Sequence, residues 1–285
     1  MSIALDTVSY TYAPGTPYAS EALKNISLTI EKGEFVGIMG KTGCGKSTLI
    51  QLIAGLLTPE SGTILLDGKD INDKKYDRGE LRRKIGVVFQ FPECQLFETT
   101  VERDVAFGLK HFGWSKEKMQ SAVEQALTIM GFDYEKVREK SPLEFSGGEK
   151  RRIAIAGILA AEPEVLILDE PIAGLDPLGR EAFLSLVKQL NASGMTILMV
   201  SHNADALAEC AERIVVLKDG RLLKDGSARE VFFDMKELQQ NGIGVSEARQ
   251  CAGLLAERGF DIAEDTICYE DLLKQLIVIG RRQKR

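Results

Sequence analysis

The chain has 285 residues, 44% of them hydrophobic and 27% charged, which is ordinary for a globular protein that folds in water. The formal net charge of −6 disfavours a general role in binding nucleic acid, because such a role calls for a basic surface. The five cysteines form no Cys-x-x-Cys pair, so we expect a reduced, cytosolic protein.

No targeting signal or membrane span is expected. The first residues, MSIALDTVSYTY, lack the basic and long apolar regions of a signal peptide. The longest apolar runs, such as IAIAGILAA at 153–161, are about half as long as a membrane-spanning helix. If the protein serves a membrane process, another chain must supply the membrane part.

Alternating and β-branched segments predict strands in the first third of the chain, and a glycine loop at 40–48 runs into a helix with an apolar face. These strands are expected at 3–12, 26–30, 34–40, 62–68 and 84–90.

Residues 98–131 predict helix, with Gly131 as its stop. Beyond it, continuous apolar runs at 164–171, 196–202 and 213–220 are typical of buried parallel strands, and helices are expected between them. The fold class is therefore α/β, with a mainly helical insert at about 92–162.

The character of the sequence changes after about residue 225, where strand-like runs give way to helical ones. We predict two domains, 1–228 and a small helical domain at 229–285. The apolar positions of the second domain either build a small core or pair with the same region of a partner chain.

Residues 40–48, GKTGCGKST, fit the phosphate-loop pattern G-x-x-x-x-G-K-[ST] between a predicted strand and a predicted helix. Gly43 and Gly45 let the backbone curl so that successive N–H groups face phosphate oxygens. Lys46 is expected to neutralise the β- and γ-phosphates, and Ser47 to bind Mg²⁺. A purely structural glycine turn is the alternative, but it does not explain Lys46 and Ser47 in register. The predicted ATP-binding residues here are Gly40, Lys41, Thr42, Gly43, Cys44, Gly45, Lys46, Ser47 and Thr48.

Polar residues at the ends of later strands complete the predicted site. Asp169 is placed to hold Mg²⁺, and Glu170 to polarise the water that attacks the γ-phosphate. The amide of Gln90 is expected to reach the metal ion or that water, and His202 to hydrogen-bond the γ-phosphate. Asp176 lies in a connecting loop, where it also suits the N-cap of a helix that begins at Pro177.

A second helix start, EFSGGEKRRIA at 144–154, also suits an anion. Ser146 is placed to cap the helix, and the glycines after it let a ligand approach the backbone. It lies about a hundred residues after the first loop, and this separation requires an explanation.

The motifs GKTGCGKST, Gln90, FSGGE, VLILDE, AGLD and His202 occur in the order of an ATP-binding cassette (ABC) ATPase, which residues 3–225 resemble. The resemblance implies a P-loop, RecA-like core with an N-terminal antiparallel β-subdomain and a helical insert. It also implies that two subunits sandwich two ATP molecules. Each phosphate loop then faces the signature motif of the other subunit, which in this sequence is FSGGE at 145–149. Tyr12 matches the aromatic residue that stacks on adenine, with Tyr10 as the alternative. The signature and D-loop residues that would act across the interface are Ser146, Gly147, Gly148, Glu149 and Asp176.

A narrower resemblance, carried by FQFPECQLFE at 89–98, by the stretch 151–177 and by the helical C-terminal extension, is to the ATPases of energy-coupling factor (ECF) transporters, and to the second of their two types. It implies a second ATPase subunit, a transmembrane T component, a substrate-capturing S component for a vitamin or metal ion, and a place on the cytoplasmic face of the membrane. Glu93 and Glu98 are expected to pair with arginines of the T component, although a solvated acidic loop is equally compatible.

Two positions depart from the family pattern. Glu149 stands where glutamine is usual, and its carboxylate suits a helix start but not a nearby phosphate, so we expect its side chain to point away. Ile172 stands where threonine is commoner, with little expected loss of catalysis. Two other functions are alternatives. A soluble ABC protein of repair or translation usually has zinc-type cysteine pairs, long coiled-coil inserts or a second cassette, and the sequence shows none of these. Glu170 argues against a scaffold that binds ATP without hydrolysing it.

Overall fold

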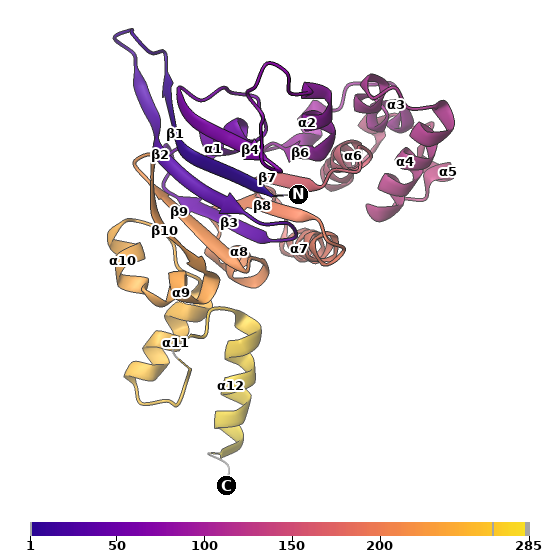
Figure 1. The fold of residues 1–285 in the computed structure, drawn as a ribbon. Helices are drawn as coiled ribbons and strands as arrows, with labels where there is room; N and C mark the ends of the chain where they lie inside the picture. Colours follow the sequence, from indigo (N-terminus) through magenta and orange to yellow (C-terminus); the bar gives the residue numbers. More distant parts are fainter. Residues whose placement is uncertain (1, 264, 283–285) are drawn as a thin grey trace.

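The computed structural model describes residues 2–263 and 265–282, and their strands form two sheets (Figure 1). The four-stranded antiparallel sheet has the order β2-β1-β4-β5. Its strands are β1 (Ile3–Tyr12), β2 (Ser20–Ile30), β4 (Ser61–Leu66) and β5 (Lys69–Asp70).

The six-stranded sheet has the order β10-β9-β3-β8-β7-β6, and all its neighbours are parallel except β10 and β9. Its strands are β3 (Phe35–Gly40), β6 (Ile85–Val88), β7 (Val165–Asp169), β8 (Thr196–Val200), β9 (Arg213–Lys218) and β10 (Arg221–Ser227). The carboxyl ends of its parallel strands meet at one edge, so the residues that follow β3, β7 and β8 are brought together there.

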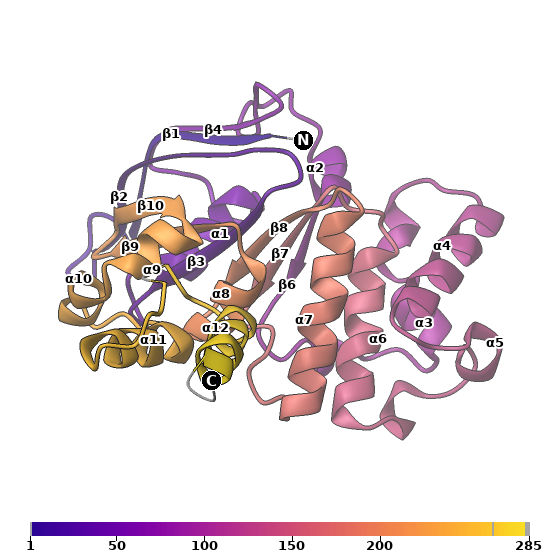
Figure 2. The ribbon, with the colours of Figure 1, turned by 90° about the horizontal axis from the view of Figure 1, so that it is seen from below.

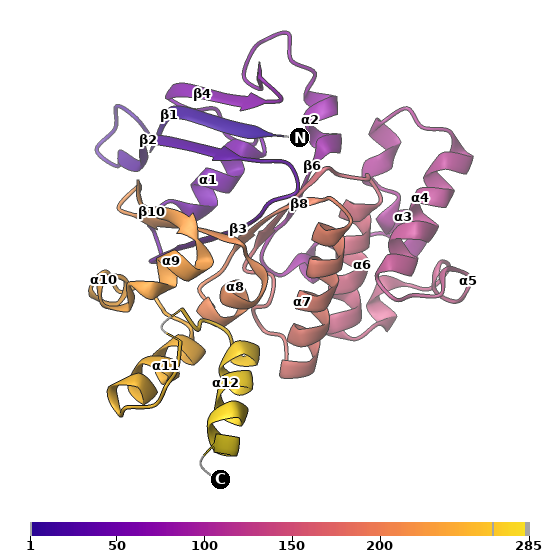
Figure 3. The ribbon, with the colours of Figure 1, turned by 60° about the horizontal axis from the view of Figure 1, so that its bottom comes forward.

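The continuous apolar runs of the central strands follow from burial on both faces. In β7, Val165 and Ile167 belong to the core between the two sheets, whereas Leu166 and Leu168 face the core on the opposite side. Helix α1 (Lys46–Ile53) lies in the first of these cores, between the sheets (Figure 3). The predicted α/β class with an antiparallel subdomain is thereby confirmed.

The predicted helical insert packs beside the β6 edge of the six-stranded sheet. Helix α6 runs beside α7, and α3, α4 and α5 lie beyond it (Figure 2). The chain leaves α4 through Gly131, which has φ of 80°, as the expected helix stop requires. The helices are α3 (Val101–Val105), α4 (Lys116–Ile129), α5 (Tyr134–Val137), α6 (Gly147–Leu159) and α7 (Pro177–Ala192).

The chain beyond β10 is helical, and α11 and α12 extend away from the sheets (Figure 1). Its first part still packs on the main core, because Phe232 and Leu238 are fully buried there. A separate small core begins at Ala248, later in the chain than the predicted boundary at 228. The helices are α8 (Ala204–Cys210), which precedes β9, and α9 (Ala228–Phe233), α10 (Met235–Gln240), α11 (Glu247–Glu257) and α12 (Tyr269–Arg282).

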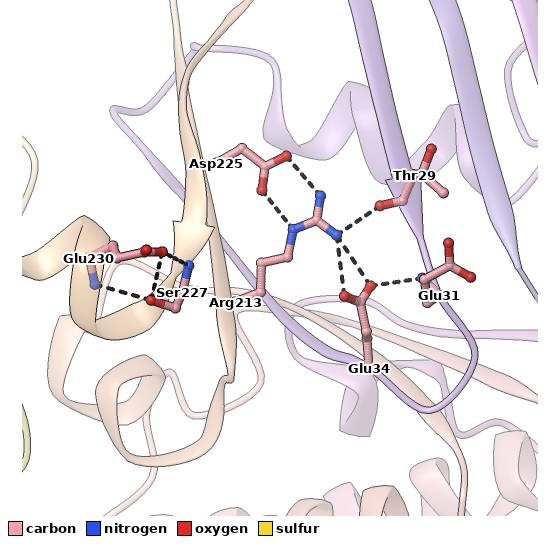
Figure 4. Close-up of polar contacts among 7 residues, drawn as sticks. All are labelled: Thr29, Glu31, Glu34, Arg213, Asp225, Ser227 and Glu230. Carbon is pink, nitrogen blue, oxygen red and sulfur yellow. Dashed lines mark hydrogen bonds and ion pairs between the residues drawn. The ribbon is translucent and has the colours of Figure 1, made fainter.

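One arginine joins the two sheets at the start of β9 (Figure 4). Arg213 donates to both carboxylate oxygens of Asp225 in β10, at 2.7 and 2.8 Å, and to the carbonyl oxygen of Thr29 in β2, at 2.9 Å. It also donates to Glu34, at 3.2 Å, just before β3. Because the guanidinium binds one carboxylate bidentately and still reaches β2, it holds the end of β2 and the residue before β3 close to the β9–β10 pair.

Candidate functional site

The loop after β3 adopts backbone angles that glycine favours. Gly40, Gly43 and Gly45 have φ of 149°, 80° and 106°. Close packing adds a second constraint at two of them. A Cβ at Gly40 would lie 2.4 Å from the carbonyl oxygen of Leu217 in β9, and one at Gly45 would lie 2.5 Å from that of Ala22 in β2.

Lys46, the first residue of α1, carries a buried ammonium group; the residue is 6% exposed. Its Nζ donates to the carbonyl oxygens of Gly40, at 2.7 Å, and Lys41, at 3.0 Å. Among residues 2–263 and 265–282, no carboxylate lies within ion-pair distance of it. It also lies 3.9 Å from the Cys44 Sγ. A buried cation whose partners are neutral is well suited to an anionic ligand.

Two carboxylates follow β7 beside this loop. Asp169 accepts a hydrogen bond of 3.4 Å from the Ser47 hydroxyl. Burial raises the pKa of the Asp169 carboxyl above its usual range, and the Ser47 hydroxyl and the Lys46 charge only partly oppose that rise.

Glu170 is held in a strained position, with φ of 48°. One carboxylate oxygen accepts the backbone N–H of His202 at 2.9 Å and lies 3.5 Å from its Nε2, and the other accepts the Ser201 hydroxyl at 3.3 Å. Burial raises the pKa of Glu170, against the opposing effect of these partners. A raised pKa makes this carboxylate a stronger base when ionised.

A cavity of about 660 Å³ opens between the loop and these carboxylates. The hydroxyl of Tyr12 lies 3.1 Å from that of Thr48 at one side, while Tyr10 contacts Tyr12 edge to face and packs on the core between the sheets. Gly40, Lys41 and Cys44 belong to the loop but do not line the cavity. The carbonyl oxygens of Gly40 and Lys41 bind the Lys46 ammonium, and Cys44 is buried. The predicted site residues that line it are Tyr12, Thr42, Gly43, Gly45, Lys46, Ser47, Thr48, Gln90, Asp169, Glu170 and His202.

The second helix start lies outside this cavity. Ser146 caps α6, as predicted, and Asp176 caps α7 by accepting the N–H of Gly179 at 2.6 Å. In the described part of the chain, the lining of the cavity includes none of Ser146, Gly147, Gly148, Glu149 and Asp176. A single copy therefore does not bring the two anion-binding helix starts together.

The expectation that the Glu149 side chain points away is wrong. Its carboxylate turns back and accepts both the N–H of Ser146, at 2.9 Å, and the Ser146 hydroxyl, at 2.7 Å. The Ser146 oxygen in turn accepts the N–H of Glu149 at 3.4 Å. This reciprocal capping box satisfies two helix-start donors, and it explains why a glutamate is compatible with this position.

The two acidic residues after Gln90 have partners within the chain. Glu93 pairs with the buried guanidinium of Arg151 in α6, at 3.0 Å, and Arg151 also donates to the carbonyl oxygens of Pro171 and Ala173. Glu98 lies 3.5 Å from the Lys110 ammonium. Arg151 thus ties the segment after Gln90 to the segment after Glu170.

Sequence reasoning missed several residues of the site. Ser20, Glu21 and Ala22 line the cavity because β2 pairs with β1 and passes over Gly45. No local motif marks them, and only the long-range pairing of the strands places them there. Arg151 lies in the basic run Lys150–Arg152, so the sequence does not mark it, and only the fold shows that it is buried while Arg152 is exposed.

Residues 23–173 match the family model described as ABC transporter. Over 286 residues the chain is 46% identical to the "Energy-coupling factor transporter ATP-binding protein EcfA2" of Clostridium acetobutylicum, with 100% of both chains covered. The chain belongs to the ABC transporter family, among its ECF ATP-binding proteins.

Solved structures agree with the assignment to the ABC family. CbiO1 of Clostridium perfringens, described as part of the ABC transporter complex CbiONQ, matches with a TM-score of 0.73 and 38% identity, over 84% of this chain and 93% of that one. The ATP-binding cassette MJ0796, in a dimer bound to ADP and Pi, matches with a TM-score of 0.68 and 34% identity, over 79% and 98% of the two chains. The predicted family and its ABC ATPase fold are confirmed. Along 2–263 and 265–282, no helix has the length and apolar character needed to cross a bilayer.

The desolvation of Asp169 predicts a pH-dependent change in stability. Its pKa is raised in the folded protein, so ionisation disfavours folding, and the penalty grows as the pH rises from the unfolded-state pKa through the folded one. Asp169→Asn removes that penalty and should unfold at a higher urea concentration than the wild type at pH 7, and the gap between the two urea midpoints should narrow as the pH falls towards the unfolded-state pKa of the aspartate. The exposed Glu124→Gln controls for the loss of one charge. An Asp169→Asn variant less stable than wild type at pH 7 would contradict this account.

Proposed function

We propose that this chain is the ATP-hydrolysing subunit of an ECF-type importer and couples ATP binding and hydrolysis to uptake through membrane partners. The observation that carries the proposal is one cavity in which the buried ammonium of Lys46 faces the carboxylates of Asp169 and Glu170. A cation without a carboxylate partner and a desolvated base on one cavity wall suit the hydrolysis of a polyanionic phosphate ester.

Each residue has a distinct role in this reaction. The amides of the loop from Thr42 to Ser47 and the Lys46 ammonium bind the phosphates, and Tyr12 lies against the adenine. Glu170 accepts the proton of the attacking water, and its strained backbone fixes the direction of the carboxylate. His202 lies beside Glu170 and binds the γ-phosphate, so the two hold phosphate and water together.

The donor set fits Mg²⁺. The Ser47 hydroxyl and the Asp169 carboxylate are already in contact, and Gln90 lines the same cavity. Oxygen atoms are the ligands that this ion prefers, and a cation would offset the desolvation of Asp169. Bound there, Mg²⁺ would neutralise phosphate charge, with Ser47, Asp169 and Gln90 as its protein ligands.

Two ATPase subunits, alike or different, sandwich the nucleotides in this proposal. Ser146, Gly147, Gly148 and Asp176 lie outside the cavity of their own chain, and they suit the cavity of the neighbouring subunit. The small C-terminal core and the exposed apolar side chains of α12 suit a dimerisation domain at 229–285. A lone subunit would therefore bind ATP but hydrolyse it poorly.

The membrane partners are a T component, which receives the motion, and an S component, which captures the substrate; nucleic acid is not among the proposed partners. The chain would lie at the cytoplasmic face of the membrane. Glu93 and Glu98 remain the proposed docking residues for T-component arginines. Glu93 already pairs with Arg151, so its substitution would also disturb the site, and Glu98 gives the cleaner test.

Substitution of the base tests the chemical role. In Glu170→Gln the amide keeps the position of the side chain but accepts no proton, so turnover should fall by about a thousandfold while ATP binding persists. Steady-state ATPase rates and equilibrium binding of labelled ATP measure both, with the exposed Glu181→Gln as the matched control. Normal turnover in Glu170→Gln would remove the assigned role.

Charge reversal at the proposed docking surface tests the membrane partner. Glu98→Lys should lower the amount of T component that co-purifies with the tagged chain, because it would place like charges together. ATP binding by the isolated chain should not change, since Glu98 does not line the nucleotide cavity. Glu124→Lys on α4 is the control for a reversed surface charge. Undiminished co-purification with Glu98→Lys would refute docking through this residue.

A further inference from the structure

The hydroxyl of Ser146 has a single proton, and the structure assigns that proton to Glu149. The hydroxyl lies 2.7 Å from the Glu149 carboxylate, which accepts hydrogen bonds but cannot donate them when ionised. The bond must therefore run from serine to glutamate. The hydroxyl that would meet a phosphate presents only its lone pairs.

Glu149 is ionised at neutral pH in this arrangement. The hydroxyl and the N–H of Ser146, in that order of effect, hold the pKa of the Glu149 carboxyl below its usual range. A phosphate that approaches Ser146 thus meets a lone pair and a full negative charge. The free amides at the start of α6 attract the same phosphate, because the first N–H groups of a helix have no carbonyl one turn earlier to bind.

The same box occurs elsewhere without this conflict. Ser227 and Glu230 at the start of α9 form it with nearly the same geometry: the Ser227 N–H and hydroxyl lie 2.9 and 2.8 Å from the Glu230 carboxylate (Figure 4). That pair lies on an element that no nucleotide is proposed to approach. Substitution of Glu230 therefore measures how much such a cap contributes to folding stability, without an effect on a nucleotide site.

We propose that Glu149 is a positioning residue of the composite ATP site: it sequesters the Ser146 hydroxyl in the open state and must release it before the neighbouring subunit's γ-phosphate can bind there. This rests on the proposed head-to-tail dimer. Glutamine at this position would remove the negative charge and loosen the hold on the serine proton, because a neutral amide oxygen is a weaker acceptor than a carboxylate. The glutamate thus weakens ATP-driven closure at the site that this chain's signature completes.

The test uses the transporter complex purified through a tag on the full chain, with ATP as the substrate. Glu149→Gln should raise kcat/KM for ATP by roughly three- to tenfold, the range that one net hydrogen bond represents. Glu149→Ala, which also frees the hydroxyl, should raise it as well. The matched control Glu230→Gln should leave kcat/KM unchanged while it shifts the thermal midpoint of the chain about as much as Glu149→Gln does.

Unchanged or lower kcat/KM in both Glu149 variants would overturn this role and leave Glu149 as a helix cap alone. That result is distinguishable from failure of the proposed function. If the wild-type complex hydrolyses no ATP, or if Lys46→Ala keeps full turnover, the ATPase assignment itself is wrong.

Discussion

The rest of the site depends on one buried charge, the ammonium of Lys46, which has carbonyl oxygens but no carboxylate at contact distance among the described residues. Its position is set by packing on all sides. Strand β3 is buried on both faces, Gly40 passes close to β9, and Gly45 passes close to β2. Because larger residues cannot occupy those glycines without moving a backbone, the loop keeps its curl and the ammonium stays where an anion can reach it.

The two carboxylates opposite Lys46 lower the stability of the folded protein, and the same features suit them to catalysis. Burial raises the pKa of both Asp169 and Glu170, and Glu170 also holds an unfavourable backbone conformation. Desolvation and strain of this kind concentrate at functional sites, where a ligand or a metal ion relieves them. The hydrophobic cores on the two faces of the six-stranded sheet offset this loss of stability.

Much of the fold was predictable, because the central strands are buried on both faces and so read as uninterrupted apolar runs. The phosphate loop, Asp169, Glu170, Gln90 and His202 were also predictable, since they follow strands whose ends meet at one edge. Residues placed by long-range pairing were not. Ser20 to Ala22 reach the cavity only because β2 crosses Gly45, and the exposed strand β10 and the short helix α2 (Arg78–Lys84) carry no long apolar pattern.

The orientation of Glu149 shows a different limit. Repulsion between the Glu149 carboxylate and a nearby phosphate predicts a side chain that points away. Two donors on Ser146 are nearer, and a local capping box forms instead. In the single chain the Ser146 hydroxyl is thus bound to Glu149 of its own helix. Ser146 lies outside its own chain's cavity, so its position still suits a nucleotide held by another subunit.

The central claim is that this chain's nucleotide binds around Lys46 and that Ser146 serves the neighbouring nucleotide. The most direct measurement is photo-labelling of this chain by an azido-ATP in the purified complex, together with the turnover rate. Lys46→Ala should lose the label, whereas Ser146→Ala should keep the label and lose most of the turnover, with Ser227→Ala as the control for a lost helix cap. Loss of the label in Ser146→Ala, or full turnover in that variant, would contradict the account.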